Sequence, residues 1–361
     1  MQNRWIQPVG FVVSVLLGAG TQAAWAQNEI FVGNTSINAT ITVYPRTANG
    51  NVPFLRRLIG PATGLNPSGV AVDTVNNELI VGNRFGGVDS ITVYPLTANG
   101  NVAPLRTIAG PATGLNTIAN LVLDTVNNEL VVANGVGDSV TVYARTANGN
   151  AAPLRTIAGA ATGIFSVNGL ASDNVNNELM VPDYLNNNVR VFARTANGNT
   201  APLRILSGAS TGLSGPYGLA VDAVNNEVWV LNNQNATITV YARTASGDTA
   251  PLRTIAGAST GLNSPVYLAL DLVNNEAFVS VNGDAVNVYA RTANGDVAPL
   301  RTIAGANTQL SGAQGIALGA SAAPPPPPSL QPVPTLDSGV LAALALVLAL
   351  LGFLAIRRMR A

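Results

Sequence analysis

The chain has 361 residues, of which 47% are hydrophobic, and its 18 basic and 18 acidic side chains leave no net charge. It has no histidine and no cysteine, and every basic residue is arginine. Nucleophile pairs that depend on histidine, and the usual zinc, haem and iron–sulfur ligands, are therefore excluded. Carboxylate chemistry and calcium bound by oxygen stay open. Because no basic run is interleaved with aromatic residues, we expect no nucleic-acid partner.

Residues 1–26 have the pattern of a secretory signal peptide. Arg4 supplies the positive start, "GFVVSVLLGAG" the apolar core, and Ala24-Trp25-Ala26 a cleavage site of the small-x-small type. We expect the mature protein to begin near Gln27 and to be exported. The absence of cysteine fits an exported protein that does not rely on disulfides.

A string of about ten residues then returns six times, first as "TVYPRTANGN" from Thr42 and "TVYPLTANGN" from Thr92. The threonines that open each "TANG" or "TASG" are Thr47, Thr97, Thr146, Thr195, Thr244 and Thr292. The steps between them are 50, 49, 49, 49 and 48 residues. A fixed period near 49 predicts a repeat architecture.

Each repeat contains four short β-rich runs, separated by Gly, Asn and Pro. In one repeat these runs are 69–73, 78–83, 90–94 and 103–110. The Asn-Gly pair at 99–100 suits the positive φ of a tight hairpin turn. The pattern predicts a four-stranded antiparallel sheet in each repeat, with the recurring string as its third strand and outer hairpin.

The two ends of the repeat region predict a closed ring. The mature chain opens with "NEIFVGN" (28–34), which matches a second strand, and "GAQGIALG" (312–319) near the end matches a first strand. Pairing these two pieces closes a ring and removes its open edges. Residues 27–320 are therefore predicted to form an all-β, six-bladed β-propeller of four-stranded antiparallel blades.

The blade pattern resembles that of NHL-type propellers over about 290 residues. The resemblance rests on four segments of one repeat, namely 218–222, 227–232, 237–241 and 251–253. The outer hairpin here is longer than is usual in that family, and the turn between the first two strands reads "DxVNNE". The resemblance implies the propeller fold.

Three recurring motifs are interpreted as structural. "GASTG" at 208–212 and 257–261 matches a nucleophile elbow, but it lies between strands in a chain without histidine. The "DxVNNE" carboxylate pairs recur evenly around the ring, so we expect Asp and Asn to bond their own turns, with a calcium site as the alternative. The fourth-strand arginines, Arg106, Arg155, Arg204, Arg253 and Arg301, are expected to carry charge that discourages edge pairing.

Positions that vary between repeats are the candidates for ligand contact. Five residues before each first-strand Asp stand Ser68, Ala119, Asn168, Tyr217 and Val266, with Gln314 equivalent in the last strand. Second strands end in Asn34, Asn83, Asn134, Asp183, Asn232 and Asn282. Both sets are predicted to lie on one face, near the central channel. The candidate ligand-binding residues are Tyr217, Asn168, Asp183, Asn134 and Asn232, and Asx-turns are the alternative explanation for the Asn and Asp positions.

The C-terminal region predicts a spacer and a membrane segment. Residues 321–332 include five consecutive prolines, which are typical of a stiff linker. Residues 339–356 carry no charge and are long enough to cross a bilayer as a helix, with basic residues after them on the cytoplasmic side.

The tail at 333–361 resembles the IPTL-CTERM sorting signal of Gram-negative bacteria. The resembling residues are Val333, Pro334, Thr335, Leu336, Arg357, Arg358 and Arg360, with the apolar helix between the two groups. The first motif residue is Val here, and the Trp that is common after the motif is missing from 337–339. The resemblance implies processing by an exosortase-like enzyme and delivery to the cell surface or exterior, and a plain membrane anchor is the alternative.

The sequence thus favours an exported, surface-sorted propeller that binds an unidentified protein or glycan, catalyses nothing and needs no cofactor. A calcium-dependent propeller hydrolase of the lactonase type is one alternative, because Asp183 is expected to lie close to Asn134 and Asn232. A purely structural surface or matrix protein is another.

Overall fold

The computed structural model describes residues 28–35, 39–84, 89–282 and 284–320. The expected signal peptide (1–26), proline-rich linker (321–332), membrane helix (339–356) and sorting signal (333–361) lie outside these residues. Within the described ranges, no helix is long and apolar enough to cross a membrane.

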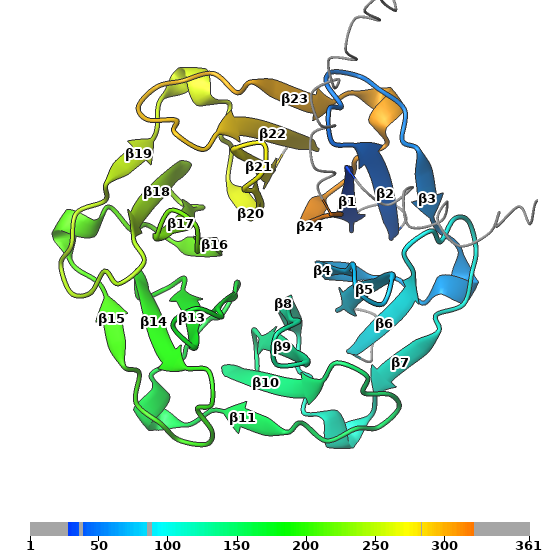
Figure 1. Cartoon of the computed structure of the whole chain (residues 1–361), viewed down its shortest axis with the longest axis horizontal. Coiled ribbons are helices and arrows are strands. Elements are labelled where there is room, and N and C mark those ends of the chain that lie inside the picture. Colours follow the sequence, from blue (N-terminus) through cyan, green and yellow to red (C-terminus); the bar gives the residue numbers. More distant parts are fainter. Residues whose placement is uncertain (1–27, 36–38, 85–88, 283, 321–361) are drawn as a thin grey trace, which may run out of the picture. The chain divides into compact units, whose positions relative to one another are not determined.

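The described residues form six four-stranded antiparallel sheets arranged as the blades of a ring (Figure 1). In order from the axis outward, blade 1 contains β24 (Ala313–Leu318), β1 (Glu29–Asn34), β2 (Thr40–Pro45) and β3 (Arg56–Leu58), and blade 2 contains β4 (Pro67–Asp73), β5 (Glu78–Asn83), β6 (Ser90–Pro95) and β7 (Arg106–Ala109). In the same order, blade 3 contains β8 (Ile118–Asp124), β9 (Glu129–Asn134), β10 (Ser139–Ala144) and β11 (Arg155–Ile157), and blade 4 contains β12 (Ala171–Asp173), β13 (Glu178–Asp183), β14 (Asn188–Ala193) and β15 (Arg204–Leu206). Blade 5 contains β16 (Pro216–Asp222), β17 (Glu227–Asn232), β18 (Thr237–Ala242) and β19 (Arg253–Ile255), and blade 6 contains β20 (Pro265–Asp271), β21 (Glu276–Val281), β22 (Ala285–Ala290) and β23 (Arg301–Ala304). The predicted all-β, six-bladed fold is confirmed.

The ring closes as predicted, through a strand from each end of the repeat region. β24 pairs antiparallel with β1, with Leu318 opposite Ile30 and Ile316 opposite Val32. The two strands lie side by side in Figure 1 although they are far apart in the sequence. Blade 1 is therefore assembled from both ends, and a break there would expose two strand edges.

The fourth strands are shorter than the sequence pattern predicts. The run 103–110 becomes β7 at Arg106–Ala109, and the residues before it, including Pro104, lie outside the strand. Proline has no N–H to give to the sheet, so it does not take part in the ladder. Short outer strands leave little free edge at the rim of the ring.

Each neighbouring pair of blades shares one hydrophobic cluster. One cluster joins blades 4 and 5 through Met180, Val191, Leu219, Val230 and Tyr241, for example, and five similar clusters lie at the other junctions. The largest fully buried side chain of the described residues is Trp229, between blades 5 and 6. Because neither sheet face of a blade is covered within that blade, stability depends on the complete ring.

The recurring "TANGN" hairpin joins each blade to the blade before it. The Gly100 N–H donates to the Arg57 carbonyl (2.8 Å), and the Ile59 N–H donates to the Gly100 carbonyl (3.0 Å). The side-chain oxygen of Asn101 accepts a hydrogen bond from the Ala62 N–H (2.8 Å). Parallel bridges of this kind recur at all six junctions. The repeated string therefore has a structural role, as the sequence predicted.

The fourth-strand arginines do not act as exposed edge charges, and that expectation is corrected. Arg106 forms two hydrogen bonds with the second-strand carboxylate of Glu78 (2.5 and 2.7 Å), and both side chains are mostly buried. Equivalent pairs are Arg56–Glu29, Arg155–Glu129, Arg204–Glu178, Arg253–Glu227 and Arg301–Glu276. The pair reaches across the third strand, so it fixes the width of the blade.

The Asp of "DxVNNE" bonds its own turn, as expected, and also joins two blades. The Asp73 carboxylate accepts hydrogen bonds from the N–H groups of Val75 (3.0 Å) and Asn76 (2.9 Å). It also receives the guanidinium of Arg145 from blade 3. Similar inter-blade pairs are Arg46–Asp271, Arg243–Asp173 and Arg291–Asp222. At the junction between blades 1 and 2, both partners differ, with Gly319 in the Asp position and Leu96 in the Arg position.

Candidate functional site

Tyr217 lies where the chain enters the first strand of blade 5. The pairing of β16 with β17 shifts register between Pro216 and Leu219, and a bulge of this kind redirects a side chain. The Tyr217 ring is half-buried and packs edge-on against Tyr184 (ring centroids 6.1 Å apart) and Tyr267 (5.8 Å apart). The aromatic residue is therefore rigid and partly accessible.

The segments that carry Asn168 and Tyr217 lie side by side at the junction of blades 4 and 5. A Cβ atom at the adjacent Gly169 would come within 2.1 Å of the Tyr217 carbonyl oxygen, so only glycine allows this approach of the two entering segments. Asn168 is half-buried, and its amide nitrogen donates to the Ser166 carbonyl at 3.4 Å. No described residue donates a hydrogen bond to its side-chain oxygen, so that acceptor can serve a ligand.

Asn134 and Asn232 are buried and bonded within their own blades. The Asn134 oxygen accepts a hydrogen bond from the Asn116 N–H (3.1 Å), and its nitrogen donates to the hydroxyl of Thr141 (3.1 Å). Asn232 repeats this arrangement with the Ser214 N–H (3.1 Å) and the Thr239 hydroxyl. Each Asn thus ties the segment entering the first strand to the third strand. This geometry favours the Asx-type alternative for these two residues.

Asp183 takes the same position in blade 4, and its charge is balanced locally. Its carboxylate accepts two hydrogen bonds from Asn186, one from the backbone N–H (3.0 Å) and one from the side chain (2.8 Å). The Arg190 guanidinium lies 3.5 Å away, at the position where four other blades have a threonine. The side chain is 1% exposed. Asp183 therefore does not present a free negative charge to solvent.

The equivalent position in blade 6 differs from the sequence alignment by one residue. Val281 pairs with Pro265 in the same way as Asn232 pairs with Pro216, and Asn282 follows the end of β21. Counted from Glu276, the first residue of β21, Val281 and not Asn282 is the counterpart of Asn232, and the loop that follows is one residue shorter than in blade 5. Asn287 on the third strand compensates by donating to the Gly261 carbonyl (2.9 Å).

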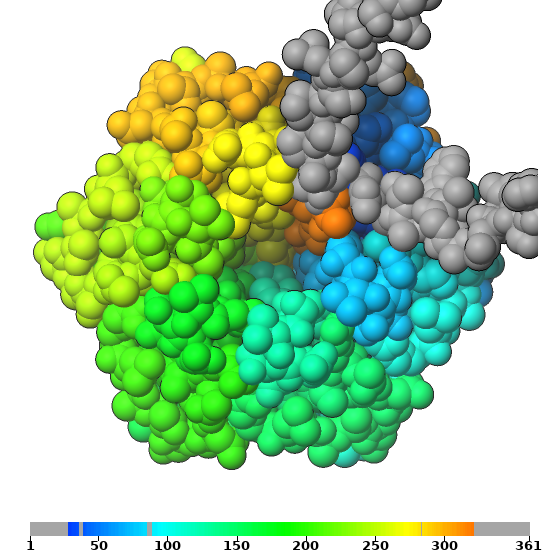
Figure 2. All heavy atoms as spheres, in the orientation of Figure 1, coloured from blue at the N-terminus to red at the C-terminus, as the bar shows by residue number. Residues whose placement is uncertain are grey.

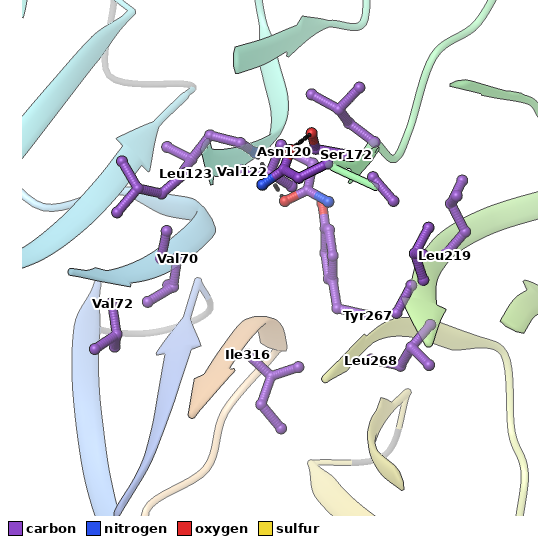
Figure 3. Close-up of a pocket in the computed structure, with 17 residues that line it drawn as sticks. Val70, Val72, Asn120, Val122, Leu123, Ser172, Leu219, Tyr267, Leu268 and Ile316 are labelled. Carbon is purple, nitrogen blue, oxygen red and sulfur yellow. Dashed lines mark hydrogen bonds between the residues drawn. The ribbon is translucent and has the colours of Figure 1, made fainter. Parts of the chain in front are cut away.

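Two tyrosines near Tyr217 were missed by the sequence reasoning. Tyr184 directly follows Asp183, and Tyr267 occupies a first-strand position that is Gly in four other blades and Asn120 in the fifth. The Tyr267 side chain extends from blade 6 toward Asn120 of blade 3 (Figure 3). Its hydroxyl donates a hydrogen bond to the carbonyl of Ala119, also in blade 3. A comparison of this column between repeats would have found Tyr267, because it is the largest departure from glycine.

Tyr267 separates the central channel into two ends. Burial raises the pKa of Tyr267 well above its usual range, so its hydroxyl stays protonated and keeps donating. On the side of Tyr217 lies a polar cavity of about 250 Å³, lined by Asn233, Ser264, Val266, Asn282, Asp284 and Gln314 together with two further residues. This cavity offers amides, one hydroxyl and one carboxylate close to the aromatic residues.

The described residues contain no cluster of three or more His, Cys, Asp or Glu that could hold a metal ion. The carboxylate of Asp183 contacts Arg190 and Asn186, as described above. Asp284, at the polar cavity, accepts a hydrogen bond from the Gly312 N–H (2.5 Å). The arrangement is suited to hydrogen bonding and aromatic stacking.

No family model matches the chain, and no curated protein matches its sequence. Among solved structures, a chain from a nidogen/laminin complex is similar, with a TM-score of 0.58 and 15% identity over 81% of this chain and 98% of that chain. A Lactobacillus plantarum protein gives a TM-score of 0.54 at 16% identity, over 77% of this chain and 82% of that one.

A functionally unknown protein from Desulfotomaculum acetoxidans DSM 771 gives a TM-score of 0.52 at 14% identity, over 76% of this chain and 80% of that one. At such low identity these similarities carry information about the fold alone. Together with the closed ring described above, they show that the chain forms a six-bladed β-propeller.

Proposed function

We propose that the protein is an exported, surface-sorted binding module whose ligand-binding face is the one that carries Tyr217 and Asn168. The observation that carries this proposal is the concentration of aromatic and polar differences on that face of an otherwise repeated ring. Tyr184 and Tyr217 supply aromatic surface, Asn168 supplies a hydrogen-bond acceptor, and the polar cavity lies nearby. Such a combination suits a glycan or a protein loop.

A glycan partner is favoured by the neutral amides and the tyrosine rings, which can stack on sugar rings. Asp183, Asn134 and Asn232 would act indirectly in either case, by holding the loops that carry the contacting residues.

The test is a glycan-array and surface-protein binding screen with the purified full chain, followed by affinity measurements on variants. Tyr217→Ala is expected to weaken binding by about 1–3 kcal/mol, as for an interface anchor, without lowering the melting temperature appreciably. Asn197→Ala, in an outer hairpin on the opposite face, is the matched control and should bind normally. A ligand whose affinity responds only to Asn197 would overturn the assignment.

The proposal includes no catalytic step and no required cofactor. A calcium-dependent hydrolase is the competing function, and calcium titration with thermal melting distinguishes the two. A rise in melting temperature with calcium that is abolished by Asp183→Asn or Asp284→Asn would favour the enzyme. An unchanged melting temperature supports the binding module.

Export and sorting are proposed on the residues at the two ends of the chain. Pro334→Ala leaves the apolar segment 339–356 unchanged, so the protein should still insert into the membrane while processing of the tail is blocked. Gel mobility and cell fractionation in the native host measure the two effects separately. Normal processing of this variant would favour a plain membrane anchor.

A further inference from the structure

A second chamber lies in the central channel, on the other side of Tyr267 from the polar cavity. Its volume is about 310 Å³, which is in the range of small-molecule sites. Its walls come from the first strands of the blades, whose inner edges pair with no other described strand. The space-filling view shows the ring hollowed at its centre (Figure 2). Nothing in the proposed binding function uses this chamber.

The polar side chains of the chamber gather on one wall. Four of its lining residues have polar side chains, namely Asn120, Ser172, Asn174 and Tyr267, and the other lining residues are Val, Leu, Ile and Ala. The first three belong to the neighbouring blades 3 and 4. Tyr267 belongs to blade 6, but its hydroxyl donates a hydrogen bond to the Ala119 carbonyl of blade 3 and so lies on the same wall. Val72, Ile316 and Leu268 line the chamber away from this wall (Figure 3).

The repeats show that the polar wall is a departure from the blade pattern. Ser172 stands where blades 2 and 5 have Val72 and Val221, and Asn120 stands where four blades have glycine. Asn174 stands where blade 5 has Ala223. All three polar residues are half-buried, and the Ser172 hydroxyl donates to the Asn174 side chain at 2.7 Å. Since the sister blades fold without these residues, the polar wall is not needed for blade structure.

The chamber also has no charged side chain among its described lining residues. Tyr267, the one ionisable residue there, is buried and neutral. The acidic residues that end the first strands, such as Asp73 and Asp173, form ion pairs with arginines of the following blades. A charged ligand would lose its hydration without gaining a counter-charge.

We propose that this chamber binds a small uncharged molecule that has an apolar body and one hydrogen-bonding end. The apolar body contacts Val72, Ile316 and Leu268, and the polar end lies at Asn120 and Ser172. Tyr267 lines the chamber and also packs against Tyr217, so it lies between the chamber and the proposed binding face.

Four probes of similar size test the proposal on the purified full chain by NMR titration: benzyl alcohol, toluene, benzoate and benzylamine. Benzyl alcohol is expected to bind at least about tenfold more tightly than benzoate or benzylamine, because burial of an unpaired charge is unfavourable. Ser172→Val and Asn120→Gly install the residues of sister blades. Together they should weaken benzyl alcohol relative to toluene by about threefold to tenfold, as expected for one lost neutral hydrogen bond.

Thr125→Ala is the matched control, because Thr125 is the exposed blade 3 counterpart of Asn174 and lies outside the chamber. It should leave all four affinities unchanged. Ala220→Phe fills the chamber and should abolish binding of benzyl alcohol and toluene, with folding checked by thermal melting. The proposal is overturned if benzyl alcohol fails to bind, if the charged probes bind equally well, or if the sister-blade replacements do not change the preference for benzyl alcohol over toluene.

Discussion

The residues in the outer part of the ring are nearly the same in every blade, whereas the residues along its axis vary between blades. Around the rim, every blade repeats the Arg–Glu pair and the "TANGN" hairpin. Between the blades, most junctions repeat an Arg–Asp pair. Along the axis, the first strands differ from blade to blade, and single residues such as Tyr217, Tyr267 and Asn120 break the pattern. The repeated contacts hold six nearly equal blades together, and the variable positions set the shape and chemistry of the two ends of the channel.

Under the proposed function, this contrast separates the residues that stabilise the ring from those that contact a ligand. Charged side chains near the rim are largely paired, so their replacement should change the free energy of unfolding. Side chains at the axis contact few repeated partners, so their replacement should change binding first. The predictions below test the structural side of this comparison, beginning with the largest effect.

Removing residues 312–320 should destabilise the ring more than any single substitution. The deletion removes β24, including the buried Ile316 and Ala317, and leaves β1 without its inner partner. Loss of one buried Ile side chain alone costs about 2–5 kcal/mol, and the exposed strand edges add to this. Thermal melting and size-exclusion chromatography measure the loss of stability and any association. An unchanged melting temperature would contradict closure of the ring by both ends.

Arg145→Leu should cost about 3–5 kcal/mol, because it leaves the Asp73 carboxylate buried without its counter-charge. The junction between blades 1 and 2 provides the natural control. There Leu96 and Gly319 occupy the two equivalent positions, so the junction forms without this Arg–Asp pair.

The double variant Arg145→Leu/Asp73→Gly copies that junction and should recover part of the lost stability. Chemical denaturation of the two single variants and the double variant gives the coupling free energy between the residues. Additive effects of the two substitutions would show that the Arg–Asp contact does not join the blades energetically.

Much of the fold could be predicted from the sequence. The period near 49 residues indicates a repeat architecture, and each Asn-Gly pair indicates a hairpin turn from its own short stretch of sequence. The roles of individual charges could not, since a pair such as Arg106–Glu78 depends on which strands become neighbours and on which face each side chain lies. The fourth-strand arginines were therefore expected to be edge charges. Only the register of the strands shows that they reach the second strand of their own blade.

The candidate site was predicted in part, for a similar reason. The position of Tyr217 and Asn168 on one face follows from the order of strands in a propeller, which the sequence indicates. The burial of Asn134 and Asn232 depends on the loop of the same blade that each one ties down, and no spacing in the sequence predicts that contact. Tyr267 crosses the channel because blade 6 alone has an aromatic residue at the first-strand position where four blades have glycine. The sequence shows this difference, but it does not show where the side chain points.

Acidification should affect the junctions that contain a buried carboxylate and spare the one that does not. Burial opposes ionisation of Asp271, but hydrogen bonds from Arg46 and Asn274 outweigh it and lower the pKa to about 2. The unfolded chain, with its ordinary pKa near 3.8, therefore takes up this proton first as the pH falls. The stability contributed by Asp271 is complete above about pH 4 and is lost progressively toward about pH 2. Asp271→Asn should lower stability near pH 7 and reduce the slope of unfolding free energy against pH in that window, as measured by urea denaturation. Equal slopes for the two proteins would show that the buried pair with Arg46 does not control the acid sensitivity of this junction.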